Sequence, residues 1–296
     1  AAKSSINIGI TGDAKGFARE LGKAQKETDK FEKGTKAAFG KLKAVGIGAA
    51  IGIGAAFVDS GLKFEAMEGI LIRGTGASGD ALEDLKTQAT DVLKKVPESA
   101  EVVAGAIADV NTFFAITGDH LETVTGLFLD FARVADMDVG GAIAGVDALM
   151  TQFNEPLEET DELLGDLVRI SQATGAPMET LLKNMEKWGP VFATAGYSAE
   201  EAAAMFGMLE ESGVDIVAVG PKLEKFFADV AEAGGEPRQA FEDIVEQIQN
   251  ATTETDALSI AAEAFGTAGS EMTSAIRDGN FDLEDFGDLM GEGTGL

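Results

Sequence analysis

The hydrophobic pattern begins with an amino-terminal arm. Ile6, Ile8 and Ile10 alternate with small or polar residues and lead into a Gly-Asp turn, which predicts a short strand. Over the next stretch, rich in Lys and Glu, seam residues recur at alternating spacings of four and three, as in a coiled-coil heptad; they are Phe17, Leu21, Ala24, Thr28, Phe31, Thr35, Ala38 and Leu42. Residues 1–43 therefore predict a strand followed by a self-association helix. A single surface helix on a globular body is the alternative.

An uncharged segment follows the arm. Residues 44–58 contain only small or apolar side chains, and a helix of that length would cover roughly 22 Å of a bilayer core about 30 Å thick. Its small residues would let another helix approach closely, in lipid or in protein; the positions of interest are Gly46, Gly48, Gly52, Gly54 and Phe57. Residues 44–63 therefore predict an apolar helix. It is either a close-packed helix in an oligomer or a latent membrane-active segment.

The body of the chain, residues 64–276, shows apolar residues at helical spacing with frequent Gly and Pro breaks. One break, Ser198 to Glu201, has the pattern of a capping box. The predicted helices lie near 64–73, 80–95, 98–116, 119–135, 139–153, 157–173, 178–194, 199–211, 221–232, 238–250 and 255–265. We expect residues 277–296 to form a flexible, acidic, glycine-rich tail. The predicted fold class is all-α: a coiled-coil-like arm and a Gly/Ala apolar helix, followed by an array of packed helical hairpins.

A short Thr/Ala-Gly step recurs within the body before leucine-bearing helices. It occurs at Thr75, Thr117, Thr174 and Ala195, at irregular spacing. A repeat protein requires a fixed period. This motif therefore does not predict a strict solenoid.

Charge separates the arm from the body. Residues 1–63 hold 11 Lys/Arg and 6 Asp/Glu, a net charge of +5, whereas residues 64–296 hold 12 and 45, a net charge of −33. An acidic body repels nucleic acid and anionic membranes at ordinary salt. We therefore expect no sequence-specific nucleic-acid binding. The same acidity would also suit a protein that works in high salt.

No catalytic, cofactor or metal site is predicted. The chain has no Cys, which excludes disulfides and thiolate metal sites, and His120 is its single His. The Asp278–Asp282 stretch has the oxygen spacing of a calcium loop, but Leu283 and Leu289 replace the required Gly and Glu. No Lys-Ser/Thr follows a glycine-rich loop, and no pair of carboxylates stands out for acid–base chemistry.

Several motifs along nearly the whole chain resemble those of one protein family. The arm and the Gly/Ala run are followed by short motifs in a fixed order: Leu62 to Met67, Leu82 to Ala89, Pro97 to Val102, Gln152-Phe153, Ser171 to Gly175, Trp188 to Pro190 and Ala195 to Ala202. This order resembles the amino-terminal part of the tail tape measure proteins of tailed bacteriophages or related archaeal viruses.

The resemblance implies a structural virion protein without enzymatic activity. It would template tail-tube assembly and length inside the tail lumen, then leave the tube to assist DNA delivery through the host envelope. The implied partners are further copies in a trimer or hexamer, tail-tube and tail-end or tail-tip proteins, assembly chaperones, and the host membrane during infection. Synthesis would take place in the host cytoplasm.

The chain is short for that family. Fully helical, 296 residues reach about 440 Å. The glycine-rich end at 291–296 favours a fragment or processed piece, whereas Ala1 suits a start after methionine removal. The alternative function is a membrane-active, pore-forming or toxin-like helical protein in which residues 44–58 are the active element. A cell-wall hydrolase module is a third reading, for which the sequence supplies no residues.

Overall fold

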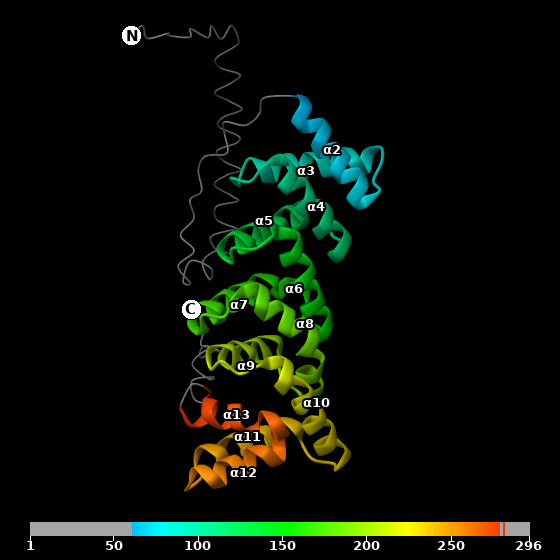
Figure 1. The fold of residues 1–296 in the computed structure, drawn as a ribbon. Helices are drawn as coiled ribbons and strands as arrows, with labels where there is room; N and C mark the ends of the chain where they lie inside the picture. Colours follow the sequence, from blue (N-terminus) through cyan, green and yellow to red (C-terminus); the bar gives the residue numbers. More distant parts are fainter. Residues whose placement is uncertain (1–60, 279–280, 282–296) are drawn as a thin grey trace, which may run out of the picture. The chain divides into compact units, whose positions relative to one another are not determined.

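The helices of the body alternate between two layers. The computed structural model describes residues 61–278 and 281 (Figure 1). The even layer contains α2 (Gly61–Thr75), α4 (Ala100–Phe114), α6 (Val139–Phe153), α8 (Met178–Ala195), α10 (Ile216–Glu232) and α12 (Glu254–Phe265). The odd layer contains α3 (Asp80–Leu93), α5 (Gly118–Val134), α7 (Thr160–Thr174), α9 (Ala199–Glu211), α11 (Pro237–Gln249) and α13 (Gly269–Arg277), with the short 3₁₀ turns η2 (Leu157–Glu159) and η3 (Gly266–Ala268) between helices.

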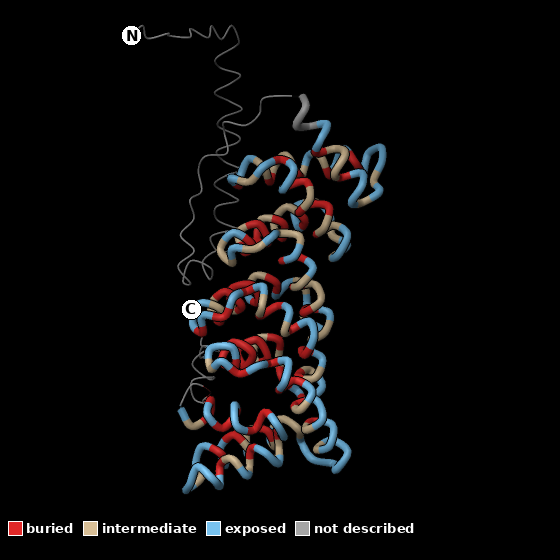
Figure 2. Tube along the Cα trace, viewed as in Figure 1, coloured by how far each residue is buried: buried red, intermediate tan, exposed pale blue. Residues whose placement is uncertain are grey.

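With one exception, between α9 and α11, each described helix packs against the helix two places further along the chain. In the even layer α2 packs on α4, α4 on α6, α6 on α8 and α8 on α10, and in the odd layer α3 packs on α5, α5 on α7 and α7 on α9. The buried residues lie where the helices face one another, and the outward faces are exposed (Figure 2). The predicted all-α array of packed hairpins is confirmed over the described residues.

The helices of each layer begin at nearly regular intervals. The even helices begin at positions 61, 100, 139, 178, 216 and 254, and in the odd layer α3, α5, η2, α9 and α11 begin at positions 80, 118, 157, 199 and 237. Both series follow a period of about 39 residues, which is within the range of helical-repeat proteins. Each repeat is one helical hairpin, and the array is a solenoid in which each hairpin buries its apolar face against the next.

Core positions recur at the same interval. In the odd layer, three columns of buried side chains advance by one period per step: Leu85, Val124, Leu163, Ala202 and Phe241; Ala89, Phe128, Leu167, Phe206 and Val245; and Val92, Phe131, Ile170, Leu209 and Ile248. In the even layer, one such column consists of Ile107, Val146, Met185, Leu223 and Ala261. All of these side chains are buried, so the period belongs to the core.

The inference against a strict solenoid is therefore wrong, for an identifiable reason. Thr75, Thr117 and Ala195 lie at or beyond the ends of even helices, whereas Thr174 ends the odd helix α7. The four occurrences of the Thr/Ala-Gly step therefore belong to two different kinds of turn. Within one kind of turn the period is plain, because the left-handed residues Gly76, Ala115 and Asn154 after the even helices are equally spaced along the chain.

Most predicted helix limits agree with the structure, and one proline site shows where the prediction failed. The sequence predicts a helix only from residue 221, after Gly220, but α10 starts at Ile216, where the Asp215 side chain accepts a hydrogen bond from the Val217 amide. Pro221 lies early in α10, and the residue four positions before it, Val217, is 62% exposed, so water can reach its carbonyl. Helix α13 was not predicted at all.

Pro190 shows how a break inside a helix is used. Proline cannot donate to the carbonyl four residues earlier, so Pro190 leaves the Glu186 carbonyl without its helical partner. The side-chain amide of Gln152 in α6 donates to that carbonyl at 3.1 Å. The lost helical bond thereby becomes a bond between neighbouring hairpins.

Glycines set the closest approaches between hairpins. A Cβ atom on Gly207 of α9 would lie 2.9 Å from the Thr174 methyl and 3.1 Å from Ile170 in α7, and one on Gly220 of α10 would lie 2.3 Å from the Trp188 ring in α8. No side chain larger than hydrogen fits at either position without displacing its neighbour. The backbones of α7 and α9 therefore meet closely at Gly207.

The odd helices α3, α5, α7 and α9 carry acidic first turns. They contain Asp80 and Glu83 in α3, Asp119 in α5, Asp161 and Glu162 in α7, and Glu200 and Glu201 in α9. Carboxylates at helix amino termini are favoured by the helix dipole. The stack also brings several carboxylates together: burial raises the pKa of Glu155 and of Asp166, and the charge of Glu200 raises both further.

A second carboxylate pair lies between α4 and α6. Burial raises the pKa of Asp109, and the nearby charge of Asp138, the N-cap residue of α6, raises it further. Burial also raises the pKa of Asp147. These carboxyl groups are less easily ionised in the folded chain than in the unfolded chain, so their ionisation at neutral pH opposes folding.

We expect Gly207→Ala to lower the free energy of unfolding by about 1–2 kcal/mol, because the added methyl would press on Thr174 and Ile170. Gly126→Ala is the matched control, since a Cβ atom there meets nothing within 4 Å. That variant should gain roughly 0.5–1 kcal/mol from helix propensity alone. Urea unfolding followed by circular dichroism measures both. Equal effects of the two substitutions would contradict the close approach.

We expect the carboxyl groups of Asp109, Asp147, Glu155 and Asp166 to make the body more stable as the pH is lowered from neutral. A raised folded-state pKa means that the folded chain binds protons more readily, so the penalty is present above that pKa and disappears as the pH falls toward the ordinary values of 3.8 for Asp and 4.5 for Glu. Asp109→Asn should reduce the rise in the urea midpoint, whereas Glu210→Gln, at an exposed site, should not. A pH dependence that is identical in both variants would contradict this assignment.

Candidate functional site at the junction of α8 to α11

The site residues predicted from the arm and the apolar segment lie outside the described residues. These are Phe17, Leu21, Ala24, Phe31, Ala38 and Leu42, and Gly46, Gly48, Gly52, Gly54 and Phe57. They stay predictions. His120 is exposed at the start of α5, and of the calcium-like loop the structure describes only Asp278 and Phe281, whose side chain is buried. Over the described residues, no group of three or more His, Asp or Glu side chains could hold a metal ion.

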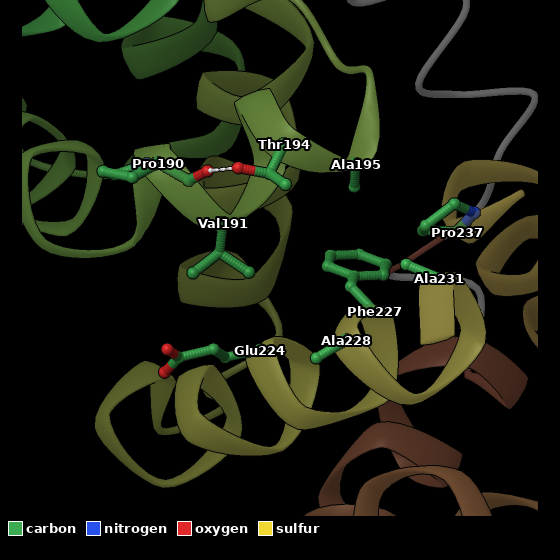
Figure 3. A pocket seen from close by; sticks show the side chains of 9 residues that line it. All are labelled: Pro190, Val191, Thr194, Ala195, Glu224, Phe227, Ala228, Ala231 and Pro237. Atoms are coloured by element: carbon green, nitrogen blue, oxygen red, sulfur yellow. Dashed lines mark hydrogen bonds between the residues drawn. The ribbon is translucent and has the colours of Figure 1, made fainter. Parts of the chain in front are cut away.

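An apolar groove opens between α8 and α10 (Figure 3). It has a volume of about 300 Å³, and its lining residues are Pro190, Val191, Thr194, Ala195, Glu224, Phe227, Ala228, Ala231 and Pro237. Phe227 is buried, while Thr194, Ala228 and Ala231 are exposed, and Glu224 is the single charged residue of the lining.

Helix length explains why the groove lies here. Helices α2, α4 and α6 have 15 residues each, whereas α8 has 18 and α10 has 17. The extra residues carry the two helices past the length of the earlier hairpins, and Thr194, Ala195 and Ala231 of the lining lie in these final turns. Small side chains there leave the space between the helices unfilled.

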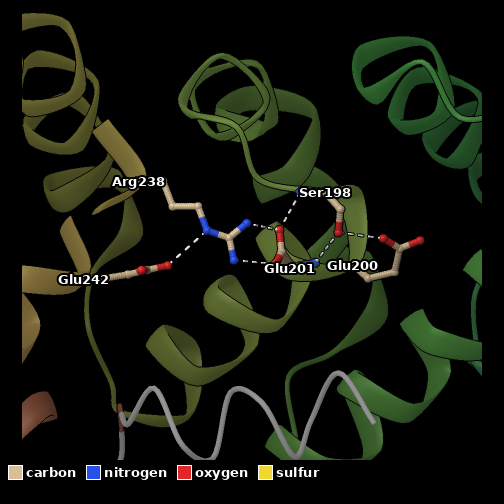
Figure 4. Close-up of polar contacts among 5 residues, drawn as sticks. All are labelled: Ser198, Glu200, Glu201, Arg238 and Glu242. Atoms are coloured by element: carbon tan, nitrogen blue, oxygen red, sulfur yellow. Dashed lines mark hydrogen bonds and ion pairs between the residues drawn. The ribbon is translucent and has the colours of Figure 1, made fainter. Parts of the chain in front are cut away.

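Arg238 of α11 forms a polar cluster beside the groove (Figure 4). Its Nη1 and Nη2 donate to the two carboxylate oxygens of Glu201 in α9, at 3.0 and 2.7 Å, and its Nε donates to Glu242 at 3.0 Å. The guanidinium lies 4.9 Å from the ring centre of Tyr197. A two-pronged bond with a stacked ring is the geometry that arginine supplies and lysine does not.

Glu201 has two roles in that cluster. It closes the predicted capping box of α9, which is confirmed: the Ser198 side chain accepts from the Glu201 amide, and the Glu201 carboxylate accepts from the Ser198 amide at 2.8 Å. The same carboxylate then receives Arg238 from 37 positions further along. The capping pattern was readable in the sequence. The partner arginine was not, because only the period of the stack places it there.

Aromatic side chains fill the interior of the junction. Phe192 of α8 lies 4.9 Å from Phe206 and 5.6 Å from Phe227 between ring centres, and Phe227 lies 5.9 Å from Phe241. Tyr197 joins this group, and burial raises the pKa of its hydroxyl. No hydrogen-bond partner of that hydroxyl is found among the described residues. The junction offers apolar surface, carboxylates and an arginine, which suit protein contacts.

Within the described part of the chain, no single helix has the length and apolarity needed to cross a membrane. The bent pair α4 and α5 passes the same test by length and composition when taken together, and its apolar side chains contribute to the core of the stack.

Comparison with known proteins identifies the family. A tape measure protein of Pneumococcus phage Dp-1 is 24% identical over 178 residues, which are 60% of this chain and 15% of that protein. The chain thus spans a small part of the length of the curated relative that it matches. No solved structure matches. A family model described as "Phage-related minor tail protein" matches residues 86–275, from α3 to α13 and more than half of the sequence, and the chain therefore belongs to the phage-related minor tail protein family.

Proposed function

We propose that this chain is a segment of a tail tape measure protein, with a structural role inside the virion tail. The observation that carries the proposal is the agreement between the family match over the helical stack and the similarity to a phage tape measure protein. A structural role fits the described residues, which contain a repeated hydrophobic core, an acidic surface and no group of metal ligands.

The stack itself would contribute little length. Neighbouring helices pack about 8–10 Å apart, so each folded hairpin extends the solenoid by roughly 10 Å. One period of about 39 residues, drawn out as a continuous helix, would extend roughly 58 Å. We therefore assign the stack to docking within the tail, against tube or tail-end proteins, and assign length measurement to continuous helix, in the arm or in longer sequence.

The remaining parts of the proposal concern residues outside the described structure. The seam from Phe17 to Leu42 would join copies of the chain into a trimer or hexamer. The arm would end at residue 43 and the apolar helix at residue 63, after which the body begins. Residues 44–58 would contact the host envelope once the protein leaves the tube to assist DNA delivery. The acidic body, with its net charge of −33 over residues 64–296, would not retain DNA that passes through the same channel.

In the virus that encodes this chain, deletion of one hairpin, residues 139–177, should change tail length by no more than about 10 Å. Deletion of four heptads, residues 15–42, should shorten tails by about 42 Å if the arm is part of the ruler. Electron microscopy of purified tails measures both. Replacement of residues 139–177 by a copy of 100–138 is the control for the hairpin deletion, because it keeps the number of repeats.

Each result has a separate meaning. Mass spectrometry that finds the chain absent from purified tails would refute the tail role altogether. Tails shortened by about 58 Å after the hairpin deletion would show that the stack is stretched and measures length. Tails of unchanged length after the arm deletion would show that sequence outside the arm sets tail length.

A further inference from the structure

The two odd-layer neighbours of α9 lie at different spacings. Toward α7 the backbone approaches closely at Gly207, where even a methyl group would clash. Toward α11 there is no comparable helix packing: α9 packs on α7 and α8, and its contact with α11 is marginal. The regular packing of each helix on the next but one is therefore interrupted once in the odd layer, between α9 and α11.

Large aromatic side chains occupy the interrupted step. Phe206 of α9 and Phe241 of α11 are connected through Phe192 and Phe227, with ring centres 4.9 to 5.9 Å apart. The distance between packed helices grows with the side chains at their contact. Phenylalanine rings from α8, α9, α10 and α11 thus fill the interrupted step, whereas glycine allows α7 and α9 to meet closely.

The even layer is also open at this step. Trp188 of α8 lies directly against Gly220 of α10. Beyond that contact the two helices leave the groove of about 300 Å³ between them (Figure 3). Trp188 against Gly220 and Phe192 against Phe227 therefore make the contact between α8 and α10 beside the groove.

On the carboxyl-terminal side of this step the helices have a core of their own. Helices α10 to α13 pack on one another, and Phe241 lies 6.1 Å from Phe265 and 6.2 Å from Phe281 between ring centres. Residues 216–278 can therefore keep their mutual contacts when their contacts with α8 and α9 change.

The bridge from Arg238 to Glu201 crosses this step (Figure 4). Side-chain exposures of 40% for Arg238 and 18% for Glu201 leave the pair within reach of water on one side. We propose that the solenoid contains a joint between α9 and α10, about which residues 216–278 move as one body, and that Arg238 is the clasp that holds the joint closed. Opening the joint widens the groove and exposes the aromatic row.

Amide hydrogen exchange on the full chain tests the clasp. Arg238→Met should speed exchange in residues 216–277 roughly tenfold, because two charge-assisted bonds to Glu201 are lost, and leave residues 61–195 unchanged. Arg169→Met is the matched control, since Arg169 pairs with Asp166 inside α7 and crosses no step. Acceleration spread over the whole stack, or none in 216–277, would overturn the proposal.

A crosslink tests the joint even if Arg238→Met does not fold. The chain has no Cys, so Thr194→Cys with Ala231→Cys places a single reactive pair across the groove. A short bis-maleimide bridge should slow exchange in residues 216–277 relative to the same variant without the bridge, and should cancel the effect of Arg238→Met. Exchange in 216–277 that is the same with and without the bridge would refute the joint.

Discussion

Burial of apolar surface between one hairpin and the next is the interaction on which this structure depends. A single amphipathic helix or hairpin cannot remove its apolar stripe from water, and a stack of hairpins can. Phe128, Leu167 and Phe206 illustrate this: each is fully buried, and each occupies the same place in its hairpin. The period of the stack is the length of chain needed to cross the two layers once and return to the same face.

Side-chain size at equivalent positions then determines how closely successive hairpins approach. Gly207 allows close contact between α7 and α9, and phenylalanine rings fill the next step, where α9 and α11 do not pack in the same way. The same sequence period is therefore compatible with tight and loose steps. This difference distinguishes the junction at α9 and α10 from the rest of the stack, although the buried column from Phe206 to Val245 continues across it.

Local sequence signals were sufficient for helices and caps. The limits of α6 and α9 were predicted to the residue, because Asp138 and Ser198 are N-cap residues whose side chains accept amide hydrogen bonds. The period was missed because Thr174 belongs to the other class of turn. Without it, the separation of Thr117 and Ala195 equals two full periods of the stack. Pro221 misled the prediction of α10, since a proline early in a helix is also tolerated where the freed carbonyl meets water.

The candidate functional site was harder to predict from the sequence than the helices and their caps, for a physical reason. The groove depends on helix lengths in two different hairpins, and the Arg238 cluster joins residues 37 positions apart, so neither leaves a short motif. A known period makes such pairs predictable, because residues about one period apart lie at equivalent places in successive hairpins. In this solenoid Glu201 and Arg238 are separated by almost one period, so an acidic cap at the start of one odd helix lies opposite the start of the next. An arginine at that start can bind the cap directly, and it does so at the odd-layer step where the helices do not pack on each other as at the other steps.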